Sequence, residues 1–106
     1  MGKKLEGQTI LVTGAGRGLG SSFCQIVAEA GAQVLALGRQ EAALRNTVAS
    51  LPGSGHDIVI ADVTDPAAVT AGLTGKAYNA VINNAGIATT AALHNSCLLY
   101  TSDAAD

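Results

Sequence analysis

The sequence predicts an α/β fold with an open parallel sheet. Four short apolar runs alternate with three segments of helical spacing, in the order βαβαβαβ. The first run ends in a glycine-rich turn, and the later connections are short. Alternation of this kind gives parallel strands joined by right-handed crossovers, with helices on both faces. We therefore expect a doubly wound parallel sheet.

The four predicted strands are residues 8–13, 34–37, 57–61 and 80–82. They are continuous apolar runs rich in Val, Ile and Leu, without the alternation of a strand that has one wet face. This composition is typical of parallel strands that are buried on both sides. Gly14 directly follows the first predicted strand, and Gly38 directly follows the second.

The first predicted helix begins at Gly18 and stops at Gly31. Its apolar residues recur at helical spacing, and we expect them to form one buried face. These residues are Leu19, Phe23, Ile26, Val27 and Ala30.

Two further helices follow. The second spans residues 41–51, with Leu44, Val48 and Leu51 on one face. The third begins with Asp65 as its cap and Pro66 in the first helical position. It is expected to be short because glycines at 72 and 75 interrupt it.

Composition excludes several classes of protein. Of the 106 residues 48% are apolar and 13% charged, with a net charge of −2, so the chain lacks the basic footprint of a nucleic-acid-binding protein. No stretch approaches the roughly 18 apolar residues of a membrane span, and no signal peptide is evident. We expect a cytoplasmic protein with no nucleic-acid or membrane partner.

Residues 97–106, CLLYTSDAAD, resemble the translation of a common transposase-type sequencing adapter. Such a tail is excluded from reasoning about the fold. The predicted organisation is therefore a dinucleotide-binding part in residues 1–96 and an adapter-derived tail in residues 97–106. On this interpretation the sequence is a truncated piece of a longer protein, a partial Rossmann fold.

The turn after the first strand reads Thr13-Gly14-Ala15-Gly16-Arg17-Gly18-Leu19-Gly20. Glycines let backbone N–H groups approach a pyrophosphate, and the following helix N-terminus adds partial positive charge. The spacing differs from G-x-G-x-x-G, and no Gly-Lys-Ser/Thr completes a P-loop. By itself this turn is also compatible with a plain strand-to-helix connection.

Two later motifs add to this turn. Asp62-Val63 follows the third strand, and Asn83-Asn84-Ala85-Gly86 follows the fourth. With Thr13-Gly14-x-x-x-Gly18-Leu19-Gly20, this set resembles the short-chain dehydrogenase/reductase family. All three motifs stand at carboxyl ends of strands, where an open parallel sheet binds ligands.

The resemblance implies a role for each motif in binding a nicotinamide dinucleotide. Residues from Gly14 to Leu19 would wrap the phosphates, and Gly20 belongs to the same turn. Asp62 would accept a hydrogen bond from the adenine amine, and Val63 would flank the ring. Asn83 would contact the adenine-side ribose, and Ala85 and Gly86 would line the path to the nicotinamide. The alternative for Asp62 and Asn83 is ordinary turn chemistry.

The end of the second strand bears on the choice of cofactor. NAD-binding dehydrogenases place an acidic residue there to hold the ribose 2′-OH, and this chain has Gly38 followed by Arg39. Arg39 and Arg17 would bind a 2′-phosphate, so NADP(H) is predicted and NAD(H) is less favoured. The alternative is that Arg39 stacks on adenine and serves both cofactors.

The family's catalytic Asn, Ser and Tyr-x-x-x-Lys lie beyond its Asn-Asn-Ala-Gly motif, so no catalytic residue is assigned. Tyr100 is followed four positions later by Ala104, not by Lys. We expect the intact parent to be an oxidoreductase of carbonyl or alcohol substrates, such as a 3-oxoacyl-thioester reductase or another ketoreductase. The parent is expected to be a homo-oligomer, and the chain itself to be inactive.

Two alternatives stay open at this point. One is a non-catalytic NADP(H) sensor on the same fold. The other is a Rossmann-like methyltransferase, which would carry an acidic residue where Gly38 and Arg39 stand. No metal site is predicted, because His56 and His94 have no second ligand at metal spacing and read as surface residues. Cys24 is predicted to pack inside the first helix rather than act as a nucleophile.

Overall fold

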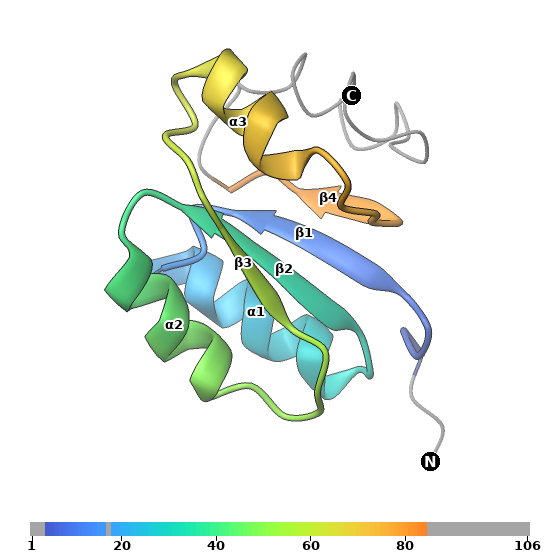
Figure 1. Cartoon of the computed structure of the whole chain (residues 1–106). Helices are drawn as coiled ribbons and strands as arrows, with labels where there is room; N and C mark the ends of the chain where they lie inside the picture. Colours follow the sequence, from blue (N-terminus) through green and yellow to red (C-terminus); the bar gives the residue numbers. More distant parts are fainter. Residues whose placement is uncertain (1–3, 17, 85–106) are drawn as a thin grey trace.

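A computed structural model describes residues 4–16 and 18–84. These residues form a four-stranded parallel sheet in the order β3-β2-β1-β4 (Figure 1). The strands are β1 (Thr9–Thr13), β2 (Gln33–Gly38), β3 (Asp57–Ile60) and β4 (Ala80–Ile82). The helices are α1 (Gly18–Glu29), α2 (Glu41–Ala49) and α3 (Pro66–Leu73). The predicted order βαβαβαβ is confirmed, and the predicted boundary between residues 96 and 97 lies outside the described residues.

The order of strands follows from the direction in which the chain winds. From β1 it moves outward to β2 and β3, and it then crosses back to place β4 on the other side of β1. This reversal beside β1 is the switch point at which open α/β sheets bind their ligands. The end of β4 therefore lies beside the end of β1, and the ends of β2 and β3 follow on the other side of β1.

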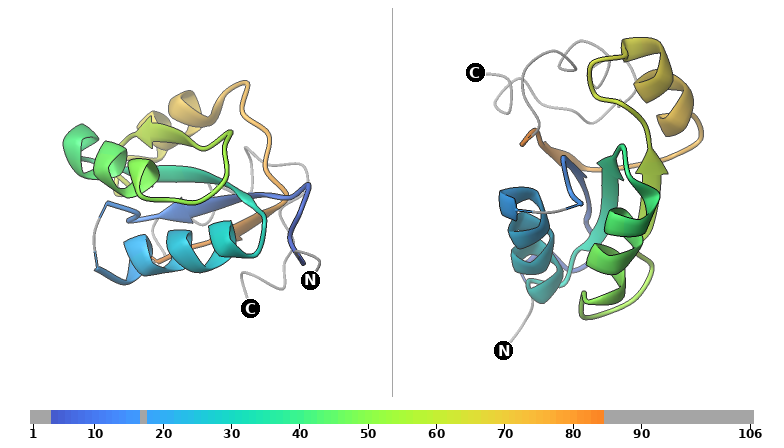
Figure 2. Two further views of the ribbon diagram at one scale, coloured as in Figure 1. Left: turned by 90° about the horizontal axis from the view of Figure 1, so that it is seen from below. Right: turned by 90° about the vertical axis from the view of Figure 1, so that its left-hand side faces the viewer.

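Alternate residues of each strand face different helices, which is why the strands are apolar throughout. Leu11 and Leu35 belong to a core cluster with Val69 and Leu73 of α3. Their neighbours in the sequence, such as Val12, pack instead with residues of α1 and α2. In both views of Figure 2, α1 and α3 lie on opposite sides of the sheet. The expected cover on both faces is therefore present.

The predicted buried face of α1 was wrong in part. Leu19 and Ile26 are 69% and 61% exposed. The buried residues of the helix are Gly20, Cys24, Val27 and Ala28. Small residues dominate this stripe because α1 packs closely against the start of its own turn and against the sheet. Leu19 and Ile26 therefore point outward, whereas Phe23 is half-buried and packs against the core as predicted.

Helices α2 and α3 begin where they were predicted, but α3 runs through Gly72, which was expected to interrupt it, and ends at Leu73. Leu44 is fully buried, and Leu51 belongs to the same cluster although α2 ends at Ala49. Asp65 caps α3 as expected, because its Oδ1 accepts a hydrogen bond of 3.2 Å from the amide of Ala68. Thr47 is also buried, which periodicity of apolar residues did not indicate.

His56 differs from the surface loop residue that was predicted. It is half-buried, and its Nδ1 accepts a hydrogen bond of 3.0 Å from the amide of Val34 in β2. Its Nε2 lies 2.7 Å from the carbonyl oxygen of Pro52. The imidazole therefore ties the loop before β3 to the start of β2, and it does so as a structural residue.

Cys24 packs in the core as predicted. It is a free cysteine with no exposed surface, and burial raises the pKa of its thiol to about 11. The thiol therefore stays protonated at neutral pH and is a poor nucleophile. Among the described helices, none is long and apolar enough to span a bilayer.

Candidate nucleotide site

A cleft lies at the carboxyl ends of β1, β2 and β3. It has a volume of about 370 Å³, and the described residues that line it are Gly14, Gly38, Arg39, Asp62, Val63 and Thr64. The first five were predicted from the sequence as binding residues. They come from three separate strand ends, and only the parallel sheet brings them to one edge. A second hollow adjoins the first and reaches toward α2.

Gly20 allows α1 to begin directly against the turn that follows β1. A Cβ at this position would lie 1.9 Å from the carbonyl oxygen of Gly14 and 3.0 Å from Nδ2 of Asn84. A backbone oxygen cannot move aside as a flexible side chain can, so only glycine fits. Gly14 and Gly18 have φ values of 63° and 65°, a region that favours glycine. Three glycines thus shape the turn.

The turn is also fastened from outside. The amide of Ala15 donates a hydrogen bond of 3.1 Å to the carbonyl oxygen of Leu37 in β2. The hydroxyl of Thr47 in α2 lies 3.1 Å from the carbonyl oxygen of Ala15 and 3.3 Å from that of Gly16. Ala15 itself is fully buried. These contacts hold the backbone of Ala15 and Gly16 in place without a ligand, and such preorganisation favours anion binding by backbone groups.

The second hollow lies between the turn and the start of α2. It is lined by Gly14, Gly16, Gly38, Arg39, Gln40, Ala43 and Leu44. Gly16 has to be small there, because a Cβ would lie 3.0 Å from the Cβ of Ala43. A Cβ on Gly38 would lie 3.1 Å from Cδ2 of Leu44, the far end of a flexible side chain. Gly38 is therefore the more tolerant of the two positions.

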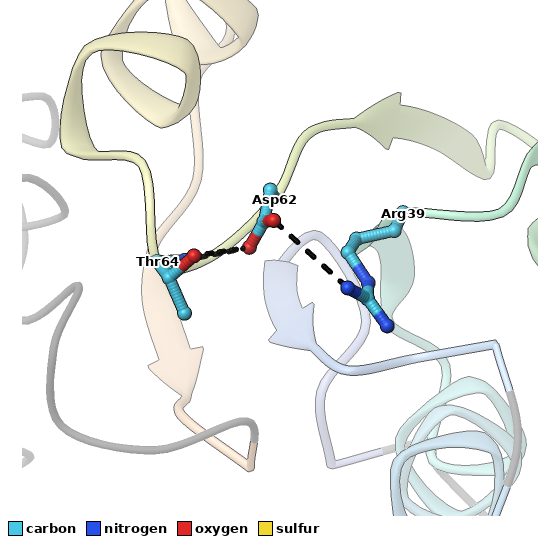
Figure 3. A network of polar contacts seen from close by, with 3 residues as sticks. All are labelled: Arg39, Asp62 and Thr64. Carbon is cyan, nitrogen blue, oxygen red and sulfur yellow. Dashed lines mark hydrogen bonds and ion pairs between the residues drawn. The ribbon is translucent and has the colours of Figure 1, made fainter.

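Arg39, Asp62 and Thr64 form a polar network across the cleft (Figure 3). Oδ1 of Asp62 accepts hydrogen bonds of 2.9 Å from the amide and 2.7 Å from the hydroxyl of Thr64. Oδ2 lies 4.0 Å from Nη1 of Arg39. The two bonds from Thr64, the hydroxyl bond above all, and the charge of Arg39 lower the pKa of the Asp62 carboxyl. The carboxylate is therefore ionised at neutral pH.

The end of β4 joins the same edge of the sheet. The hydroxyl of Thr13 at the end of β1 donates a hydrogen bond of 3.0 Å to Oδ1 of Asn83. Nδ2 of Asn84 lies 3.5 Å from the carbonyl oxygen of Gly14. These contacts hold the strand-end asparagines against the glycine-rich turn. Asn83 and Asn84 therefore lie beside the turn that Gly20 and Gly14 shape.

Most of the predicted site residues lie at this edge of the sheet. Leu19 is exposed there, and Val63 is partly buried against the core of α3. Arg17, Ala85 and Gly86 lie outside the described residues. Thr64 and Thr47 were not predicted from the sequence. The spacing Asp-x-Thr, in which a carboxylate accepts bonds from a residue two positions later, could have indicated Thr64. Residues 4–16 and 18–84 contain no group of three or more potential metal ligands.

Comparison with known proteins identifies the family. A family model described as short chain dehydrogenase matches residues 8–99. The chain belongs to the short-chain dehydrogenase family. Galactitol 2-dehydrogenase (L-tagatose-forming) of Cereibacter sphaeroides is 36% identical over 89 residues, which are 80% of this chain and 35% of that protein. L-xylulose reductase of Bos taurus is 37% identical over 89 residues, 83% of this chain and 36% of that protein.

Solved structures of short-chain dehydrogenases share the arrangement of strands and helices. L-sorbose reductase of Gluconobacter frateurii, solved with NADPH and L-sorbose, superposes with a TM-score of 0.73. It is 26% identical and covers 82% of this chain, which covers 36% of it in turn. A putative betaketoacyl-ACP reductase superposes with a TM-score of 0.70 at 34% identity, over 79% of this chain and 35% of that one. The chain spans about a third of the length of these relatives.

Proposed function

We propose that this chain is the nucleotide-binding part of an NADP(H)-dependent oxidoreductase that acts on carbonyl or alcohol carbons. The observation that carries the proposal is the shared cleft at the switch point, where Gly14, Gly38, Arg39, Asp62 and Val63 meet. These residues come from motifs at three strand ends of a short-chain dehydrogenase. On this proposal, residues 1–96 belong to a longer protein, and residues 97–106 are the adapter-derived tail.

The residues present fit a dinucleotide. Gly20 packs so closely against the carbonyl group of Gly14 that no side chain fits between them. A glycine-rich segment of this kind presents backbone rather than side chains to a phosphate. Helix α1 begins at Gly18, within this glycine-rich segment, and has no acidic residue in its first turn. Its N-terminal partial positive charge is therefore left for an anion. Asp62 and Val63 border the cleft where an adenine ring would lie.

The end of β2 supports a preference for NADP(H). Gly38 brings no carboxylate that would repel a 2′-phosphate, and Arg39 follows at the rim of both hollows. The side chain of Arg39 is 67% exposed, so its guanidinium can turn toward a phosphate with little loss of packing. Charge-assisted contacts between guanidinium and phosphate are among the stronger hydrogen bonds in proteins.

Each residue of the site then has a separate task. The glycine turn holds the pyrophosphate, Asp62 and Val63 hold the adenine, and Asn83 contacts the adenine-side ribose. The family resemblance implies that Ala85 and Gly86, which lie outside the described residues, would line the path toward the nicotinamide. A bound nicotinamide supplies or accepts the hydride that moves to or from the substrate carbon. The resemblance implies that a tyrosine beyond these motifs moves the proton.

The substrate is a small molecule with a carbonyl or hydroxyl group. Relatives named for galactitol, L-xylulose and L-sorbose support polyols and ketoses as candidates. A 3-oxoacyl-[acyl-carrier-protein] reductase of Vibrio cholerae, 33% identical over 88 residues, keeps acyl thioesters among them. The full-length protein is proposed to be a homo-oligomer.

The test compares the full-length protein with the 106-residue chain. Oxidation of NADPH and NADH is measured with a panel of ketoses and 3-oxoacyl thioesters. The full-length protein should turn over and favour NADPH in kcat/KM, whereas the short chain should stay at background. Clear turnover by the short chain would contradict the assignment of catalysis to later residues. Nucleotide binding without turnover by the full-length protein would instead favour a sensor.

A further inference from the structure

Among the described residues that line the cleft, Thr64 is the one that no sequence motif assigned to nucleotide binding (Figure 3). Its amide and hydroxyl both donate to the same atom, Oδ1 of Asp62, at 2.9 Å and 2.7 Å. Two donors from one residue fix the rotation of the carboxylate as well as its position. The threonine therefore determines how Asp62 presents itself to the cleft.

The two carboxylate oxygens of Asp62 therefore have different partners. Oδ1 is engaged by Thr64, whereas Oδ2 points to the other side of the cleft, 4.0 Å from Nη1 of Arg39 (Figure 3). Arg39 follows β2 and Asp62 follows β3, so Oδ2 lies between the two strand ends. An adenine bound in this cleft would need a hydrogen-bond acceptor for its amine. Because Thr64 binds Oδ1, Oδ2 is the carboxylate oxygen that could accept this bond.

We propose that Thr64 is a positioning residue of the nucleotide site, which orients Asp62 so that Oδ2 faces the adenine and Arg39. The proposal rests on the proposed function, because it assigns the adenine to this cleft. The proposal assigns Thr64 no contact with the nucleotide of its own. It acts through Asp62, and it does so for NADPH and NADH alike, since both carry the same adenine.

The same two bonds favour the charged form of the carboxyl, which gives a second readout. The hydroxyl of Thr64 makes the largest contribution to the lowered pKa of Asp62, followed by its amide. Loss of the hydroxyl should therefore raise that pKa toward its ordinary value. Asp62 would then become protonated at a higher pH as a solution is acidified, and its acceptor would be lost earlier.

The experiment measures dissociation constants of NADPH and NADH for Thr64→Val in the full-length protein. Valine keeps the shape and the backbone amide but lacks the hydroxyl. Both constants should rise about threefold to tenfold, as expected for one exposed hydrogen bond to a charged group. The acid limb of the NADH affinity should move to higher pH than in the wild type. NADH is used for this limb because it has no 2′-phosphate that titrates.

Three variants serve as controls. Thr64→Ser keeps both donors and should restore affinity and the position of the acid limb. Thr74→Val removes a hydroxyl that donates only to the carbonyl of Thr70, at 2.9 Å, beyond the far end of α3, and should change neither. Asp62→Asn should bind more weakly and lack the acid limb that Asp62 causes.

The outcomes separate this proposal from the proposed function. A Thr64→Val protein that matches the wild type in both affinity and acid limb would overturn the role of Thr64 alone. The same holds if Thr64→Ser is as weak as Thr64→Val. A full-length wild type that binds neither nucleotide would overturn the proposed function, and the role of Thr64 with it.

Discussion

The two sides of the cleft are built by different means. On the side of β1 the turn consists of backbone packed against backbone, and Gly20 leaves no room for even one carbon atom beside Gly14. On the side of β2 and β3 the cleft is bordered by the exposed polar side chains of Arg39, Asp62 and Thr64. One side is defined by shape and the other by charge.

This difference indicates how each side responds to change. In a closely packed turn a single added carbon atom has no space, so it lowers the stability of the folded protein. Exposed charged groups are solvated and adjustable, so their contributions are smaller and depend on salt and pH. We therefore expect substitutions on the β1 side to act on folding and binding together. Substitutions on the other side should act on the choice and affinity of the nucleotide.

The largest effect is expected from Gly20→Ala. The new Cβ would meet the carbonyl oxygen of Gly14 at 1.9 Å, so the turn and α1 must move apart. The free energy of unfolding should fall by at least the ~1–3 kcal/mol typical of an overpacked position, and NADPH affinity should fall with it. Thermal unfolding and nucleotide titration of the full-length variant check both. Gly7→Ala is the control. It adds a Cβ at another glycine, whose φ is +84°, but no atom lies within 4 Å of that Cβ. This variant should leave nucleotide binding intact.

The next effect concerns the choice between NADPH and NADH. Arg39→Ala should weaken NADPH about tenfold, after discount for exposure of the guanidinium, and leave NADH nearly unchanged. Gly38→Asp should reverse the preference, because its carboxylate repels the 2′-phosphate and can bind a ribose 2′-OH.

The matched control for this position is Gly38→Asn, which adds nearly the same volume near Leu44 without the charge. Values of kcat/KM for both cofactors decide the matter. An equal loss for NADPH and NADH in Arg39→Ala would support stacking of Arg39 on adenine. A wild type that favours NADH would contradict the preference itself.

A smaller effect is expected from Thr47→Val. The hydroxyl is buried and donates to the carbonyl oxygens of Ala15 and Gly16. Valine lacks this hydroxyl, so the two carbonyl groups would lose their hydrogen-bond donor from α2. The loss should be about 1–2 kcal/mol of unfolding free energy, measured by urea denaturation. Thr47→Ser should retain most of the stability. If valine were neutral, the turn would not depend on α2 for its shape.

The smallest effect is expected far from the cleft, at the ion pair of Asp57 and Lys76. Nζ of Lys76 lies 2.7 Å from Oδ2 of Asp57, and both side chains are substantially exposed. The hydrogen bond from Lys76, followed by that from the amide of Ile58, lowers the pKa of the Asp57 carboxyl. Because the pKa is lower in the folded protein, the pair stabilises it at neutral pH, and this contribution fades as the pH falls through the folded pKa.

Lys76→Met should therefore cost less than about 1 kcal/mol at neutral pH. The difference from the wild type should shrink as the solution is acidified, and nucleotide affinity should stay unchanged. Urea denaturation at several pH values measures the first two, and titration with NADPH measures the third. A larger cost that persists in acid would show that Lys76 contributes by packing rather than by charge.

The sequence by itself determined the features that depend on neighbours along the chain. Apolar runs and helical spacing predicted the seven elements and their order, because burial on both faces leaves its mark on each strand separately. The cap of Asp65 with Pro66 was equally local. The motifs at Gly14, Asp62 and Asn83 predicted the edge of the sheet at which the cleft lies, since parallel strands end together there.

Tertiary structure decided what depends on the approach of distant segments. The contact of Gly20 with Gly14 sets how α1 is rotated, so Cys24 and Ala28 face the core and Ile26 does not. Helical periodicity fits several rotations nearly as well, and the choice lies outside the helix. Thr47 and His56 likewise acquire their roles from the backbone of other elements.

The polar side of the cleft combines both levels. The bonds between Asp62 and Thr64 span two residues and could be anticipated from the chain alone. The approach of Arg39 could not, because it depends on β3 lying beside β2, with Gly38 opposite Ile60. Sequence spacing fixes which groups are available within a turn. The pairing of β2 with β3 decides that the turn with Arg39 faces the turn with Asp62. No local pattern in the sequence encodes the distance between these two turns.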